Sequence, residues 1–141
     1  MVINQANLND FIADKIKALK CREDTKAYVT SIFDKYKFAN FDYSKESITI
    51  LYKNAQSKQN FASFQNLADW LFLCETMFPQ HLNNASEEYY QTIARLSYNS
   101  CYNLIQRRWI LFDELAQNYV YIVSDTRKIL KSNYNHQKIQ S

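Results

Sequence analysis

Two charged residues in this sequence have mostly apolar neighbours, which makes them the first candidates for chemistry. Asp69 and Arg95 each lie inside a stretch that is otherwise apolar. A buried charge is costly unless it is paired and hydrogen-bonded. We therefore expect Asp69 and Arg95 to pair across neighbouring helices, with Tyr90 or Tyr98 adding a hydrogen bond. Such a pair would either fix the register of two helices or form a polar pocket in which Arg95 holds an anionic ligand.

A second candidate group combines aromatic and basic side chains, in the order Tyr102, Arg107, Arg108 and Trp109. Residues of these types are enriched at protein interfaces, and they can also stack on nucleic-acid bases. The surrounding segment 61–120 holds six acidic and three basic side chains, which argues against phosphate binding. For the tyrosines we rank core packing first, a protein interface second and nucleic acid third. The four residues are our candidate interface.

Residues suited to metal or nucleophilic chemistry are few. His81 and His136 are the only histidines, and neither follows a Glu by three residues as a di-iron helical bundle requires. No cysteine pair has the short spacing of a zinc site. Cys74 adjoins Glu75, which raises the pKa of a thiol and so lowers its reactivity. We therefore predict no metal, no cofactor and no enzymatic activity.

The three cysteines also bear on the compartment. Cys21, Cys74 and Cys101 are odd in number, far apart and mostly set among apolar residues. This pattern is typical of reduced thiols packed as small hydrophobic side chains in the cytosol. We find neither a signal peptide nor an apolar run of about 20 residues that could span a membrane. The prediction is a cytoplasmic protein.

The elements that position these residues are predicted to be helices. The chain has 141 residues, with no glycine and one proline. Phosphate-binding loops and nucleophile elbows need glycine where the backbone takes a positive φ or approaches a ligand closely. Tight hairpins usually need it as well. A chain without glycine therefore favours an all-α fold, in which Asn can replace glycine after a helix.

Apolar residues recur at helical spacing over most of the chain. The first two predicted helices span about 8–20, beginning at Asn7 or Asn9, and about 24–36. Residues 37–47 are predicted to be a loop. The pattern over 48–53 fits a helix or a strand, and we favour the helix because the flanking turn residues suit a hairpin poorly. Residues 54–60 are a predicted linker. The remaining helices span about 61–77, 86–105 and 108–131, and residues 132–141 are a predicted frayed tail.

The segment from Thr25 to Val123 resembles a family of uncharacterised all-helical bacterial proteins. The resemblance rests on DTKAYVTSIF, NLADWLFLCETMFPQHL, EEYYQTIARLSYNSCYNLI and LFDELAQNYVYIV, in this order. Members of that family tend to have glycine where this chain has Ala68 and Ala94. Alanine is the smallest substitute, so close helix packing there can survive. The resemblance implies a helical fold and names no activity.

Together these observations predict a single all-α domain over residues 1–141, a bundle of five or six helices around a central apolar pair, about 61–77 and 86–105. The predicted function is a non-catalytic protein-interaction or regulatory module, whose partner is another protein or a second copy of the chain. The alternative is a small-molecule binding protein with a pocket near Asp69, Arg95 and Tyr98. The basic, amphipathic first helix could also dock into a partner or lie on a membrane surface, although packing on its own domain is the simpler interpretation.

Overall fold

The computed structural model describes the backbone of residues 5–35, 48–83 and 85–140, and the side chains of 11–35, 48–83 and 85–131. Within these ranges the chain forms six α-helices and one short 3-10 helix, with no strand. Their order is α1 (Gln5–Ile16), α2 (Glu23–Lys35), α3 (Ile48–Lys58), α4 (Phe61–Met77), η2 (Pro79–His81), α5 (Glu87–Leu104) and α6 (Ile110–Gln140). The predicted all-α domain is confirmed, and residues 48–53 are helical.

Helix α4 lies at the centre of the fold. It contacts α2, α3, α5 and α6, and nine of its residues are buried, including Phe64, Leu71 and Phe72. A helix whose apolar residues point to nearly all sides can bury them only if other helices surround it. The predicted central pair is therefore confirmed as α4 and α5, which pack against each other over most of their length.

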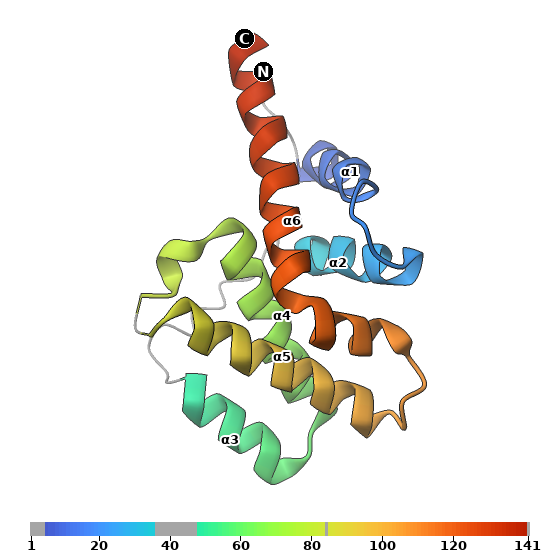
Figure 1. Cartoon of the computed structure of the whole chain (residues 1–141), viewed down its shortest axis with the longest axis vertical. Coiled ribbons are helices and arrows are strands. Elements are labelled where there is room, and N and C mark those ends of the chain that lie inside the picture. The colour runs from blue at the N-terminus through green and yellow to red at the C-terminus, as the bar shows by residue number, and fades with distance from the viewer. Residues whose placement is uncertain (1–4, 36–47, 84, 141) are drawn as a thin grey trace.

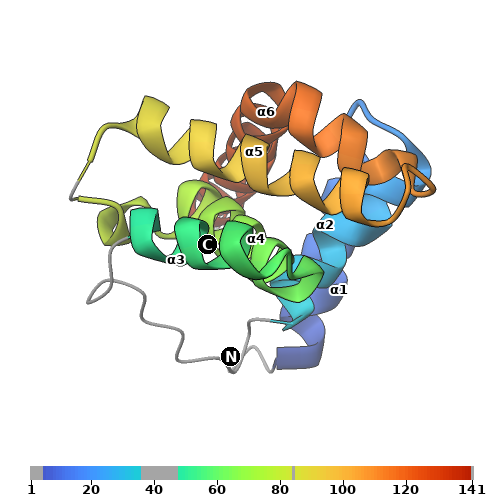
Figure 2. The same ribbon diagram turned by 90° about the horizontal axis from the view of Figure 1, so that it is seen from below.

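The other helices enclose this pair in layers. Helix α5 and the first part of α6 lie together across one face of α4, while α3 and α2 flank α4 on its two sides (Figure 2). Helix α1 packs on α2 and α6 (Figure 1). Helix α6 bends at Asn118, where φ is −111° and ψ is 20°, and its last turns extend past the rest of the bundle.

The starts of the two central helices follow from their capping residues. The Asn60 side chain accepts a hydrogen bond from the Ser63 backbone N–H at 3.2 Å, and the Ser86 hydroxyl accepts one from the Tyr89 N–H at 3.1 Å. These bonds satisfy N–H groups that have no partner within the helix. Glu87 and Glu88 follow Ser86 in the first turn, where negative charge favours the helix dipole.

The ends of α3 and α5 show how a chain without glycine terminates its helices. Gln59 has φ of 48°, and its N–H and that of Asn60 bond to the carbonyls of Gln56 and Ala55. Gln106 has φ of 58° and is followed by the same bonding pattern after α5. This is the Schellman arrangement, in which glycine usually occupies the left-handed position. We had expected Asn in this role, and glutamine fills it instead.

Several predicted boundaries are wrong. Helix α1 begins at Gln5, before either predicted capping residue. Helix α6 begins at Ile110 rather than at about 108, in a connection where Gln106 and Arg107 have positive φ. Residues 54–58 belong to α3 rather than to a linker, since Ala55 is buried while its polar neighbours face solvent. The backbone of 132–140 continues α6, where we predicted fraying. The predicted loop 37–47 lies outside the described residues.

Candidate functional site

Asp69 is the centre of a buried network that joins three helices. Its side chain is only 2% exposed. The Tyr28 hydroxyl of α2 lies 2.8 and 2.9 Å from its two carboxylate oxygens, and the Tyr98 hydroxyl of α5 donates to Oδ1 at 2.8 Å. Gln65 Nε2 donates to the Tyr28 oxygen at 3.0 Å. We call these four residues the Asp69 network, and it ties α2, α4 and α5 together.

Burial dominates the electrostatics of this network. Desolvation raises the pKa of Asp69 from 3.8 to about 6, and the hydrogen bonds from Tyr28 and Tyr98 oppose part of that rise. Desolvation, with the nearby Asp69 charge, also raises the pKa of both tyrosines well above 10, so each hydroxyl remains a donor. The carboxyl therefore has good hydrogen-bond partners, and these partners come from the fold itself.

The predicted pairing of Asp69 with Arg95 is wrong. Arg95 is exposed, and its Nε donates to the backbone carbonyl of Ala116 on α6 at 3.2 Å. Its neighbours explain the error, because Ala94 is fully buried while Leu96 is 44% exposed. Arg95 thus lies at the edge of the apolar face, from which a long side chain reaches solvent. Tyr98 does bond to Asp69 as predicted, whereas Tyr90 lies elsewhere.

Tyr90 lines a second polar feature, a cavity of about 360 Å³. The pocket is formed by the end of α4, the η2 turn, the start of α5 and the second half of α6. Its lining residues, which define the Glu75 pocket, are Glu75, Pro79, Leu82, Glu87, Tyr90 and Arg127. This volume lies near the lower end of the range for small-molecule sites, roughly 300–1,000 Å³.

Glu75 is the unusual residue of this pocket. Its side chain is 1% exposed, and neither carboxyl oxygen has a hydrogen-bond partner among the residues that the structure describes. Arg127 does not neutralise it directly, since its guanidinium donates to the Glu75 backbone carbonyl through Nε and pairs with the Glu87 carboxylate at 2.9 Å. A buried carboxyl without partners is rare in native structures and calls for an explanation.

The pKa of Glu75 reflects this isolation. Desolvation raises it from 4.5 to about 7, and the Glu87 charge contributes in the same direction. The Tyr119 hydroxyl and the Arg127 charge oppose the rise, although Tyr119 makes no hydrogen bond of normal geometry with the carboxyl. Glu75 can therefore lose or gain a proton near neutral pH, and it is one of the residues that line the pocket.

The candidate interface residues separate in the structure. Tyr102 is half-buried and packs on the core. Arg107 and Arg108 are exposed; Arg107 bonds to Asn103 in the last turn of α5, and Arg108 bonds to Gln106 in the connection to α6. Trp109 is 57% exposed, and its ring stacks on Phe112 with centroids 6.1 Å apart. Arg108 and Trp109 together line one hollow of the surface.

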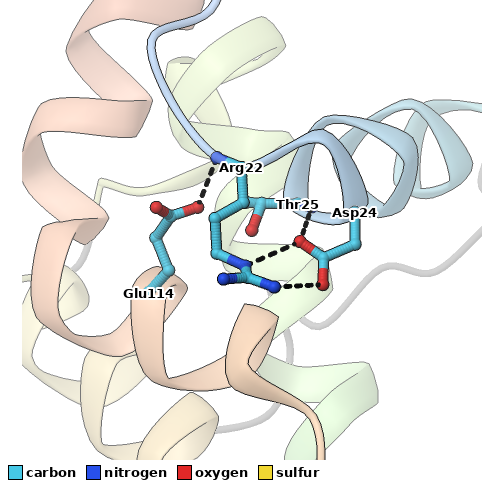
Figure 3. A network of polar contacts seen from close by, with 4 residues as sticks. All are labelled: Arg22, Asp24, Thr25 and Glu114. Carbon is cyan, nitrogen blue, oxygen red and sulfur yellow. Dashed lines mark hydrogen bonds and ion pairs between the residues drawn. The ribbon is translucent and has the colours of Figure 1, made fainter.

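That hollow, with a volume of about 380 Å³, is lined by Arg22, Asp24, Arg108, Trp109, Ile110 and Leu111, which we call the Trp109 groove. One wall is fixed by a polar network (Figure 3). The Arg22 guanidinium bonds to both Asp24 oxygens at 3.0 and 3.3 Å, while the Arg22 backbone N–H donates to Glu114 at 3.0 Å. Asp24 also accepts from the Thr25 backbone N–H at 2.9 Å. The connection between α1 and α2 is thereby held against α6.

The cysteines are free thiols in packed surroundings. Cys74 and Cys101 are buried, as predicted, and Cys21 is half-buried against the core. Desolvation raises the pKa of Cys21 to about 11 and that of Cys74 to about 12, with nearby Glu114 and Glu75 adding to these rises. Desolvation raises the pKa of the Cys101 thiol as well, so all three thiols remain protonated at neutral pH.

Among the residues that the structure describes, no group of three or more potential ligands among His, Cys, Asp and Glu is placed to hold a metal ion. Within the same ranges, no helix combines the length and apolar character needed to cross a bilayer.

Sequence reasoning missed two residues that matter here. Tyr28 has the spacing of an apolar core residue in the second predicted helix, and this spacing gives no sign that its hydroxyl is a partner of Asp69. Glu75 was considered only as a neighbour of Cys74. Its signal was nevertheless present, since it is a second carboxylate in the same apolar helix, six residues after Asp69. Both residues acquire their roles from helices that are distant in sequence.

In comparisons with known proteins, the chain matches no family model, no curated protein and no solved structure. The resemblance to a bacterial helical family thus stays a prediction.

Proposed function

We propose that this protein is a non-catalytic interaction module that binds a segment of a partner protein in the Trp109 groove. The observation that carries the proposal is the position of Trp109, which is 57% exposed next to Ile110, itself 48% exposed. Tryptophan and arginine are the residues most enriched at the energetic centres of protein interfaces. Here both types line one hollow of the surface.

The groove is ordered before any partner arrives. The Trp109 ring stacks on the buried Phe112, and the Arg22 backbone is bonded to Glu114 across the groove wall. A surface that is already ordered loses little conformational entropy on binding, which favours affinity.

Charge indicates the chemistry of the partner. Asp24 neutralises Arg22 through a two-point contact, whereas Arg108 bonds only to the neutral side chain of Gln106 among the described residues. An apolar side chain that covers Trp109 and Ile110, next to an acidic residue that meets Arg108, would match this surface. A cytosolic location is part of the proposal, supported by three cysteines that remain free thiols.

A photo-reactive amino acid at position 110, in cells that express the protein, tests the proposal. We expect it to capture a defined protein, with the adduct lost in a Trp109→Ala background. The same probe at Lys53, which is exposed on α3, is the control. Identical adducts from both positions would contradict the proposal. Sedimentation velocity of the pure protein shows whether the captured partner is a second copy of this chain.

A further inference from the structure

The Glu75 pocket lies near the opposite end of α5 from the Trp109 groove and has no part in the proposed interaction. Its lining contains two carboxyls and one guanidinium. Arg127 pairs with Glu87 at 2.9 Å and also donates to the Glu75 backbone carbonyl. Its cation is thus largely compensated by Glu87, and the Glu75 carboxyl is the group in excess.

Neither carboxyl oxygen of Glu75 has a hydrogen bond of normal geometry among the described residues. The Tyr119 hydroxyl lies close enough to the carboxyl to lower the pKa of Glu75, and it is the one donor near the carboxyl that this pKa reflects. The bond from Tyr119 of α6 falls outside normal hydrogen-bond geometry, and Cys74 is a weak donor. His81 of η2 is exposed, with its ring against Phe78. A group that completes the site must therefore bring its own hydrogen-bond donors. A positive charge on that group would also balance the excess carboxylate.

The remaining lining defines the body of such a group. Pro79 and Leu82 are apolar, and Tyr90 is an aromatic residue that is 4% exposed. Apolar lining with a few polar groups is typical of small-molecule sites. An ammonium group near a carboxylate and an aromatic side chain gains from both, since the face of the ring attracts cations.

We propose that the Glu75 pocket binds a small organic amine in its protonated form, with the ammonium group on the Glu75 carboxylate and an apolar body against Pro79, Leu82 and Tyr90. The ammonium supplies the donors that Glu75 lacks and neutralises its charge. The Arg127–Glu87 pair remains in place at the pocket and does not contact the ammonium.

Binding of this kind is linked to the protonation of Glu75. Glu87 and Tyr90 of α5, Tyr119 and Arg127 of α6 and the neighbouring Cys74 are the titratable or charged groups around the carboxyl. Since the pKa of Glu75 is about 7, a cation that binds only the carboxylate releases about half a proton per ligand at pH 7. Affinity for the amine therefore rises as pH increases through 7 and levels off above it.

Titration calorimetry with 2-phenylethylamine tests this proposal, using 2-phenylethanol as the neutral analogue of the same shape. At pH 8 we expect the amine to bind at least about tenfold more tightly than the alcohol, because it alone pairs with the carboxylate. Two buffers of different ionisation enthalpy give the number of protons released. Glu75→Gln should reduce amine affinity to that of the alcohol, and Glu88→Gln, at an exposed position of α5, should leave it unchanged.

Three results would each overturn the proposal: no measurable binding of the amine, equal binding of amine and alcohol, or full binding by Glu75→Gln. Circular dichroism shows whether each variant is folded. We expect Trp109→Ala to bind the amine as tightly as the unmodified protein does. The test of the Glu75 pocket is therefore independent of the test of partner binding in the Trp109 groove.

Discussion

Replacing Glu75 with glutamine removes a buried charge while almost preserving the size of the side chain. Both carboxyl oxygens are buried without a hydrogen-bond partner among the described residues. The pKa of this group rises from 4.5 to about 7 on folding, chiefly by desolvation, which corresponds to about 3 kcal/mol against the ionised form. Ionised Glu75 thus opposes folding, and an amide at the same place avoids that cost.

The sign of the pH dependence follows from the direction of the pKa shift. Because the folded state holds the proton more tightly than the unfolded state, the contribution of Glu75 to stability is greatest below about pH 4.5. It is lost as pH rises from there to about 7, and it changes little above. Glu75→Gln should therefore match the unmodified protein near pH 4.5 and exceed it by about 3 kcal/mol at pH 8.

Urea denaturation followed by circular dichroism, at several values between pH 5 and 8.5, measures this difference. The difference between the two proteins at each pH isolates Glu75, since Asp69 titrates in both. Glu88→Gln controls for the loss of a charge from an exposed position of α5. Curves for the unmodified protein and Glu75→Gln that run parallel across this range would refute the reasoning, because Glu75 would then not be desolvated in the folded state.

Three further predictions concern other parts of the fold. Asp69→Ala should lower the free energy of unfolding in urea by about 2–4 kcal/mol, because two tyrosine hydroxyls lose their acceptor. Arg95→Ala, at an exposed position, should lower it by less than about 1 kcal/mol, and equal losses in the two variants would contradict the Asp69 network. Gln59→Gly should raise the free energy of unfolding by about 0.5–1 kcal/mol in the same assay, because glycine takes the positive φ of 48° at this position without a steric cost. A destabilised variant would argue against the left-handed conformation. Trp109→Phe should sharply reduce acrylamide quenching, because the remaining Trp70 is only 4% exposed; unchanged quenching would show that Trp109 is covered.

The helical architecture was accessible from the sequence because its determinants are local. The bounds 61–77 predicted for α4 coincide with the structure, since Asn60 caps its start and Pro79 follows its end. The end of α3 was missed because residues 54–58 are mostly polar, and the burial of Ala55 depends on packing against other helices. Local patterns thus locate a helix well when both of its ends have their own signals.

The candidate site was only partly accessible, for a related reason. The position of Asp69 in an apolar helix correctly indicated burial, and Tyr98 was correctly considered as a donor. The sequence could not identify Tyr28 as the second donor, because periodicity defines the faces of a helix and not which helix lies against each face. Arg95 was assigned to the core from its neighbours, although a long basic side chain at the edge of an apolar face can reach solvent.

The two buried carboxyls of α4 differ in what surrounds them, and this difference separates a structural role from a functional one. Asp69 accepts hydrogen bonds from Tyr28 and Tyr98, so the fold itself supplies the donors that its carboxyl requires. Glu75 is equally buried, and neither of its oxygens accepts a hydrogen bond of normal geometry within the described chain. Replacing it with an apolar residue would remove the cost of its burial. A ligand in the Glu75 pocket would explain why a carboxyl that lowers stability is buried there, because the ligand would supply the interactions that the fold does not.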